Sequence, residues 1–274
     1  MPDLAGKVAL VTGASSGIGA AMARQLAAWK CDLVVTARRE DRLEALCGEL
    51  AALGVSARAV REDLADPAGP ARLHAAVRAL GPIDILVNNA GFGAYQSFAD
   101  TPWPRHVELL QLNVLSLVEL CHRFLPELLA RPGRAHVLNV ASIAAFVSVP
   151  YFASYGGSKA YVLGFSESLA AELAASSVRV TCLCPGGTTS EFSDVAGQTL
   201  GRAARAGMMS AERCAAIGLR GMLRGRRVVV PGGSNKATHV LSRLMPRRLM
   251  GAAGARLLGK PATAALPRPN PQDP

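Results

Sequence analysis

Residues 7–19 read K-V-A-L-V-T-G-A-S-S-G-I-G, and this stretch decides the fold. Its first six residues are mostly apolar and β-branched, which predicts a buried strand. Glycines then stand at positions 13, 17 and 19, and an alanine-rich amphipathic segment to residue 30 predicts a helix. Glycines let a backbone approach a pyrophosphate, and a helix N-terminus adds N–H donors and a partial positive charge. The stretch therefore predicts a nucleotide-binding strand–turn–helix unit.

Strands and helices continue to alternate beyond this unit. Apolar, β-branched runs predict further strands over residues 32–36, 55–61, 83–87, 134–141, 178–184 and 227–230. Helical patterns cover residues 40–53, 67–80, 104–130 (as one helix or two in sequence), 155–175 and 210–224. Such alternation is typical of α/β proteins. We expect a Rossmann-like doubly wound parallel sheet of about seven strands, with helices on both faces, in a single domain.

The composition indicates the cellular compartment in which this protein is expected. Half of the 274 residues are hydrophobic, which is enough for one large α/β core. No apolar run approaches the ~18 residues of a membrane span, and no signal-peptide pattern precedes the first strand. The cysteines form neither a C-x-x-C pair nor a disulfide framework, so we expect reduced core thiols in a cytoplasmic protein. They are Cys31, Cys47, Cys121, Cys182, Cys184 and Cys214.

The net charge of +10 is concentrated in the C-terminal quarter. Residues 201–274 carry fourteen Lys and Arg against two acidic residues, whereas residues 1–200 carry sixteen against eighteen. Residues 234–260 have the spacing of a basic amphipathic helix that Pro246 interrupts, and the proline-rich residues 261–274 are expected to be a disordered tail.

Two interpretations of the basic segment remain open. Its apolar face packs on the core or on a partner subunit, or residues 236–260 lie on an anionic membrane surface. Nucleic-acid binding is not expected, because neither a nucleic-acid motif nor interleaved aromatic residues accompany the basic ones.

The candidate catalytic residues lie in residues 142–159, which read S-I-A-A-F-V-S-V-P-Y-F-A-S-Y-G-G-S-K. Tyr155 and Lys159 stand four residues apart on a predicted helix and so share one face. At ~4 Å and an effective dielectric constant of ~20, a cation favours the phenolate by about 4 kcal/mol, or about three pKa units. Ser142 ends the preceding strand and can donate a hydrogen bond to a substrate oxygen. The three residues together could transfer a proton to a carbonyl or from an alcohol. Packing tyrosines also occur in this pattern, and these residues alone do not decide between the two interpretations.

The end of the second predicted strand indicates which cofactor binds. In NAD-binding units an acidic residue about 20 positions after the glycine turn binds the ribose 2′-hydroxyl. Ala37 stands there in this chain, and Arg38 and Arg39 follow. The guanidinium fork of Arg38 suits a 2′-phosphate, whereas Arg39 is expected to begin the solvated helix that follows. The pattern favours NADP(H) over NAD(H).

A set of short motifs resembles the short-chain dehydrogenase/reductase family over roughly residues 4–233. The motifs are T-G-A-S-S-G-I-G (12–19), D-L (63–64), N-N-A-G (88–91), Asn113, Ser142, Y-G-G-S-K (155–159) and P-G (185–186). Each motif is modest, but the ordered set is highly specific. Residues 37–43, 184–192 and 228–236 look like those of bacterial NADP-dependent members. The resemblance implies a catalytic domain over residues 1–233, a substrate lid at about 188–225, and a homodimer or homotetramer.

The resemblance also implies residue roles. Tyr155 would be the general acid in carbonyl reduction and the base in alcohol oxidation. Lys159 would bind the nicotinamide ribose and lower the Tyr155 pKa. Ser142 would polarise the carbonyl, Asn113 would hold a proton-relaying water, and Asn89 would stabilise the fourth strand beside the cofactor. The residues expected to contact NADP(H) are Gly13, Ser15, Ser16, Gly17, Ile18, Gly19, Arg38, Asp63, Leu64, Asn89, Ala90, Gly91, Tyr155, Lys159, Pro185, Gly186, Thr188 and Ser190.

The predicted function is NADP(H)-dependent interconversion of a carbonyl and a secondary alcohol, without a metal. The substrate is expected to be small and hydrophobic, of a 3-oxoacyl, steroid or ketone type. The alternative is a non-catalytic NADP(H)-binding sensor or regulatory protein on the same fold; such proteins typically lose the tyrosine or the lysine, and both are present here. The expected substrate pocket is mostly apolar and comprises Phe92, Tyr95, Ala144, Phe146, Tyr151, Phe152 and Phe192.

Overall fold

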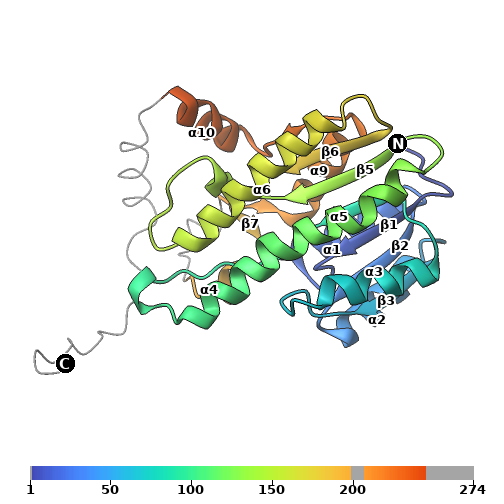
Figure 1. Cartoon of the computed structure of the whole chain (residues 1–274), viewed down its shortest axis with the longest axis horizontal. Helices are drawn as coiled ribbons and strands as arrows, with labels where there is room; N and C mark the ends of the chain where they lie inside the picture. Colours follow the sequence, from blue (N-terminus) through green and yellow to red (C-terminus); the bar gives the residue numbers. More distant parts are fainter. Residues whose placement is uncertain (1, 199–206, 245–274) are drawn as a thin grey trace, which may run out of the picture.

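The computed structural model describes residues 2–198 and 207–244, and its centre is one seven-stranded parallel sheet (Figure 1). The strand order is β3-β2-β1-β4-β5-β6-β9. This confirms the expected doubly wound sheet. The order reverses between β1 and β4, and in such sheets ligands bind at the carboxyl ends of the strands beside this reversal. The strands are β1 (Val8–Thr12), β2 (Asp32–Ala37), β3 (Ala57–Arg61), β4 (Ile85–Asn88), β5 (Ala135–Val140), β6 (Val178–Leu183) and β9 (Val228–Val229).

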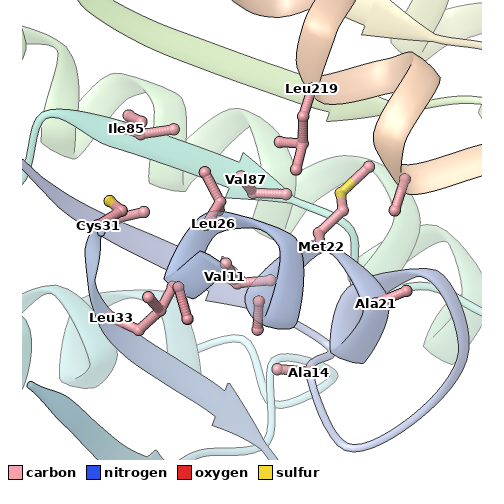
Figure 2. Close-up of a cluster of buried hydrophobic side chains, with 14 of the residues drawn as sticks. Val11, Ala14, Ala21, Met22, Leu26, Cys31, Leu33, Ile85, Val87 and Leu219 are labelled. Carbon is pink, nitrogen blue, oxygen red and sulfur yellow. The ribbon is translucent and has the colours of Figure 1, made fainter. Parts of the chain in front are cut away.

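Helices cover both faces of the sheet. One face carries α1 (Gly17–Ala28), α2 (Glu40–Ala51) and α9 (Ala211–Leu223), and the other carries α3 (Gly69–Leu80), α5 (Ser116–Leu129) and α6 (Ala153–Glu172). Figure 2 shows the first face, where Met22 and Leu26 of α1 and Leu219 of α9 pack over the strand residues Val11 and Val87. All five side chains are fully buried, so this apolar layer holds the glycine turn of α1 against the sheet.

Residues 104–130 form two helices joined by a π-helical turn. These are α4 (Trp103–Leu110), the turn η2 (Gln111–Leu115) and α5. A π turn inserts an extra residue into a helix and often occurs at functional sites. Asn113 lies in the middle of this turn, completely buried. The sequence left one or two helices open, and the structure shows two.

The segment after β6 differs from the expected lid at residues 188–225. A short strand pair, β7 (Thr188–Thr189) and β8 (Met209–Ser210), and the helical turn α7 (Phe192–Val195) lie over the carboxyl edge of the sheet. The expected boundary is wrong at its C-terminal end, because α9 belongs to the core. Cys214, Ala215 and Leu219 are fully buried against α1 and the sheet.

The basic C-terminal segment is described only in part. Residues 233–244 form the helix α10 (Gly233–Leu244), which agrees with the start of the predicted helical segment. The remainder of that segment, residues 245–260, and the predicted tail, 261–274, lie outside the described residues. Among the helices that the structure describes, none is long and apolar enough to cross a bilayer. The cytoplasmic location therefore stays a prediction.

Two helical glycines provide a matched test of the packing. At Gly48 of α2 an added Cβ would meet no atom within 4 Å, so Gly48→Ala should stabilise the protein by ~0.5–1 kcal/mol. At Gly221 of α9 the Cβ would lie 2.4 Å from Cγ2 of Val229, so Gly221→Ala should destabilise it by ~1–3 kcal/mol. Thermal unfolding should show a midpoint raised by ~1–4 °C for the first variant and lowered for the second. Shifts in the same direction would contradict this packing.

Candidate active site

The glycine turn is fixed to the end of β4 by a small hydrogen-bond network. The Thr12 hydroxyl donates to the carbonyl of Val87 (3.2 Å) and accepts from the backbone N–H groups of Asn89 (2.9 Å) and Ala90 (3.0 Å). The Asn89 amide donates to the carbonyls of Thr12 (3.0 Å) and Gly13 (3.2 Å). Asn89 thus ties the turn to the fourth strand, in line with the stabilising role that the resemblance implied.

A cavity of about 2400 Å³ opens along the carboxyl edge of the sheet. Every residue expected to contact NADP(H) lines it except Gly19. Gly19 is buried instead, and an added Cβ would lie 2.4 Å from the carbonyl oxygen of Gly13. Its role is therefore close packing inside the turn. The expected cofactor residues that line the cavity are Gly13, Ser15, Ser16, Gly17, Ile18, Arg38, Asp63, Leu64, Asn89, Ala90, Gly91, Tyr155, Lys159, Pro185, Gly186, Thr188 and Ser190.

Tyr155 and Ser142 meet at the inner part of this cavity. Tyr155 lies in the first turn of α6, and Ser142 follows β5 at the start of the short helix η3 (Ile143–Ala145). The two side chains are hydrogen-bonded, and both are more than nine-tenths buried. Burial raises the pKa of Tyr155 to about 12, because a phenolate is poorly solvated there, while the Ser142 hydrogen bond acts in the opposite direction. At neutral pH this environment therefore keeps the Tyr155 phenol neutral.

Lys159 is one helical turn beyond Tyr155 and is also buried. Its Nζ donates to the carbonyl of Val140 (2.9 Å) and lies 5.8 Å from the centroid of the Tyr155 ring. Burial lowers the pKa of Lys159 to about 8. The sequence predicted a Tyr155 pKa lowered by this cation; in this structure burial dominates, and the pKa is raised.

Asn113 contacts the residues of the site without lining the cavity. Its Oδ1 accepts from the N–H of Phe92 (3.1 Å), and its Nδ2 donates to the carbonyl of Phe92 (2.9 Å) and to Ser158 Oγ (3.2 Å). The side chain lies outside the cavity lining, so it positions Phe92 and the β4 loop. A water relay at Asn113 stays a prediction.

The two arginines after β2 take different directions. Arg38 points to Glu108 of α4, with 3.9 Å between Nη1 and Oε1, and its side chain is 62% exposed. Arg39, expected only to begin α2, donates through Nη2 to the hydroxyls of Ser15 (3.1 Å) and Ser16 (3.2 Å) in the glycine turn. Both arginines line the cavity. Sequence reasoning missed Arg39 because the dipeptide alone does not indicate which side chain turns inward.

The substrate side of the cavity is aromatic. Phe92, Tyr95, Ala144, Phe152 and Phe192 line it as expected. The rings of Phe152 and Phe192 each lie 5.3 Å from the Tyr155 ring, centroid to centroid. The reactive phenol thus stands between two aromatic walls.

Two expected pocket residues lie outside the lining. Phe146 packs against His239 of α10, with 4.1 Å between the ring centroids. Tyr151 adopts a left-handed backbone conformation (φ 65°) and stands edge-on to Tyr95. The loop from 146 to 151 directs Val147, Ser148 and Val149 into the cavity in their place.

Helix α10 supplies a wall that the sequence did not assign. Ser234, Asn235, Thr238 and Leu241 line the cavity, and an added Cβ on Gly186 would lie 2.4 Å from the Asn235 amide. In Figure 1, α10 lies beyond β6 and the N-terminal part of α6. The basic amphipathic spacing did not reveal this, since three of these four residues, Ser234, Asn235 and Thr238, are small and polar.

Comparisons with known proteins agree with this geometry. The family model described as short chain dehydrogenase matches residues 7–201. An uncharacterized oxidoreductase of Myxococcus xanthus is 35% identical over 193 residues, which are 70% of this chain and 76% of that protein. A 7beta-hydroxysteroid dehydrogenase of Collinsella aerofaciens is 30% identical over 214 residues, which are 76% of this chain and 80% of that protein.

A solved structure extends the likeness to nearly the full chain. It is a short-chain dehydrogenase from Sphingobium yanoikuyae in complex with NADPH, with a TM-score of 0.78 and 32% sequence identity. The match covers 94% of this chain and 98% of the other. The ordered motifs, the parallel sheet and these matches lead to one conclusion: this chain belongs to the short-chain dehydrogenase family and is an oxidoreductase that acts on CH–OH groups.

Proposed function

We propose that this enzyme interconverts a carbonyl and a secondary alcohol on a small hydrophobic substrate, with NADP(H) as cofactor and Tyr155 as acid and base. One observation carries the proposal. The Tyr155 hydroxyl, hydrogen-bonded to Ser142, stands between two aromatic walls in a cavity that continues to the glycine turn.

The residues of the turn fit a dinucleotide. Gly13 and Gly17 adopt left-handed conformations (φ 65° and 55°) that bring the backbone to the cavity, and α1 begins there without a side-chain cap. Ser16 and Thr188 also line the cavity and add hydroxyl groups. These groups would hold the pyrophosphate, Leu64 and Asp63 the adenine, and Lys159 the nicotinamide ribose. When bound, NADP(H) would supply or accept the hydride.

The protein's own contribution is proton transfer and charge stabilisation. In reduction, the neutral Tyr155 phenol donates its proton to the carbonyl oxygen while Ser142 donates a hydrogen bond to the same oxygen. The raised Tyr155 pKa keeps this acid protonated at neutral pH. In oxidation Tyr155 must first lose its proton, and the buried Lys159 cation stabilises the resulting phenolate.

The apolar pocket favours a ketone, steroid or 3-oxoacyl substrate. Phe92, Tyr95, Phe152 and Phe192 offer flat apolar surface around the phenol. One relative is described as a 7beta-hydroxysteroid dehydrogenase and another, from Nostoc, as a ketoacyl reductase. The sensor alternative has less support, because Ser142, Tyr155 and Lys159 are all present and lie together.

Tyr155→Phe tests the acid–base role. It removes the phenolic hydroxyl and with it the transferable proton, so turnover of a carbonyl panel with NADPH should fall about 10²–10⁴-fold while NADPH binding is retained. Tyr161→Phe is the matched control, because Tyr161 lies on the same helix but is 51% exposed. Alcohol oxidation should also accelerate as the pH rises above neutrality, because the phenol must ionise. A Tyr155→Phe enzyme with wild-type turnover would refute the role; NADPH binding without turnover of any substrate by the wild type would favour the sensor.

Cofactor preference can be tested at the two arginines. We propose that Arg38 and Arg39 both contact the 2′-phosphate, so Arg38→Ala and Arg39→Ala should each weaken NADPH binding. Charge-assisted hydrogen bonds contribute ~1.5–3 kcal/mol, or about ten- to a hundredfold in Kd. NADH affinity should stay within about twofold. The control is Arg24→Ala, since Arg24 pairs only with Glu49 in this structure (2.7 Å). Equal wild-type affinity for NADPH and NADH would contradict the proposed preference.

We propose further that the enzyme associates into a homodimer or homotetramer through the surface of α4. Trp103 is 69% exposed, and Phe98, at 62%, contacts the same His106 ring as Trp103. Leu115, at the end of the turn that follows α4, is 56% exposed. Large apolar side chains grouped in this way mark interaction surfaces. Light scattering should show an oligomer that Trp103→Glu shifts towards monomer. The control, Leu53→Glu on another face, should not change the mass, and a wild type that is monomeric at micromolar concentration would exclude this association.

A further inference from the structure

Glu191 joins the lid to the residues that surround the proposed 2′-phosphate site. Its Oε2 lies 2.9 Å from Nη2 of Arg39, and its Oε1 accepts a short hydrogen bond from Nη1 of Arg42. The same Nη2 of Arg39 also donates to Ser15 and Ser16 of the glycine turn. We call the carboxylate of Glu191 with the guanidinium groups of Arg39 and Arg42 the Glu191 clasp.

The clasp resembles an anion site whose anion comes from the protein itself. Two guanidinium groups surround one carboxylate, and two serine hydroxyls lie on the same guanidinium. The hydrogen bonds from Arg42 and Arg39 lower the pKa of Glu191 to about 2, so the carboxylate is charged at every working pH. The three charged side chains are 40–43% exposed, which leaves them open to an incoming ligand.

The position of Glu191 in the chain connects this charge cluster with the reaction centre. Ser190, on one side, packs on the glycine turn: an added Cβ on Gly17 would lie 2.9 Å from its Cβ. Phe192, on the other side, stacks near Tyr155. The carbonyl of Glu191 accepts from the N–H of Val195 and so begins the lid turn α7. Glu191 therefore stands in the chain between a residue that contacts the glycine turn and one that contacts Tyr155.

We propose that Glu191 is an internal competitor of the cofactor's 2′-phosphate, so that the phosphate displaces its carboxylate from Arg39 and releases the lid. The inference rests on the NADP(H) site proposed above. A phosphate monoester carries about −1.5 to −2 charges near pH 7 and three acceptor oxygens, against one charge and two oxygens for the carboxylate. Displacing the Glu191 carboxylate from Arg39 costs binding free energy. Only a 2′-phosphorylated ligand compensates for this cost, through its own contacts with Arg39. A ligand without this phosphate leaves the clasp closed.

Binding of adenosine fragments separates this effect from the rest of the cofactor. The full chain, Glu191→Gln and the control Glu49→Gln are titrated calorimetrically with 2′,5′-ADP and with 5′-AMP. Glu49 pairs with Arg24 on the surface of α1 and α2, so the control removes the same charge outside the cavity. If the carboxylate occupies Arg39 in most molecules, Glu191→Gln should bind 2′,5′-ADP about three- to tenfold more tightly. Its affinity for 5′-AMP, and both affinities of Glu49→Gln, should stay at wild-type values.

Each of the other outcomes shows whether the NADP(H) preference or only the clasp proposal is wrong. A wild type that binds 2′,5′-ADP no more tightly than 5′-AMP contradicts the NADP(H) preference itself, and the clasp proposal falls with it. A wild type that prefers 2′,5′-ADP, with unchanged or weaker binding in Glu191→Gln, overturns the clasp alone. Equal gains for both ligands, or equal gains in the Glu49→Gln control, also overturn it.

Hydrogen exchange tests the release of the lid directly. The N–H groups of Val195 and Ala196 donate to the carbonyls of Glu191 and Phe192, both at 2.9 Å. In the wild type, 2′,5′-ADP should speed exchange at these two amides, whereas 5′-AMP should not. Identical exchange with the two ligands would overturn the release step.

Discussion

The contact between the ends of β1 and β4 is the constraint on which the rest of the site depends. These strands are far apart in sequence but adjacent in the sheet, and the sheet order reverses at this point. Thr12 and Asn89 join them through a buried hydroxyl and an amide that satisfy five backbone groups. A polar group buried at this place without a partner would cost ~1–3 kcal/mol, so the two segments specify each other. The glycine turn, the β4 loop and, through Asn113, the wall at Phe92 take their positions from this contact.

The electrostatics of the reaction centre follow from burial more than from any pair of charges. Tyr155 and Lys159 are both nearly inaccessible, and desolvation favours the neutral form of each. A phenol kept neutral suits proton donation, and an ammonium group with a lowered pKa holds its charge less firmly than a surface lysine. In the same dry site, any charge that develops on a substrate oxygen interacts strongly with the Ser142 hydroxyl and with Lys159. Low polarity around the phenol therefore supports the proton transfer and the apolar substrate that are proposed for this site.

Most of the fold, and the identity of the residues that converge, could be predicted from the sequence. Strand, turn and helix each have a period or a glycine pattern that one segment displays by itself, and parallel strands bring their ends to one edge. The directions of individual side chains could not be predicted in the same way. Arg38 and Arg39 are adjacent, and only tertiary packing decides which one meets Ser15. Phe146 and Tyr151 lie in an irregular loop where no period applies, and α10 lines the cavity mostly with short polar residues that have no sequence signature. The lid boundary was placed too far along because α9 is amphipathic like any surface helix, while its apolar face is covered by α1.

The placement of the two ends of the described chain has a practical consequence for handling the enzyme. The amino end of the chain, marked N in Figure 1, lies near the amino ends of the strands. The cavity is lined by residues at the opposite, carboxyl ends of the strands. Helix α10 belongs to the cavity wall itself, with Asn235 against Gly186. A resin, fluorophore or fusion partner joined at the amino end therefore stands away from the cavity. One joined through α10 would be attached to part of the binding surface, which makes the amino end the better point for immobilising this catalyst.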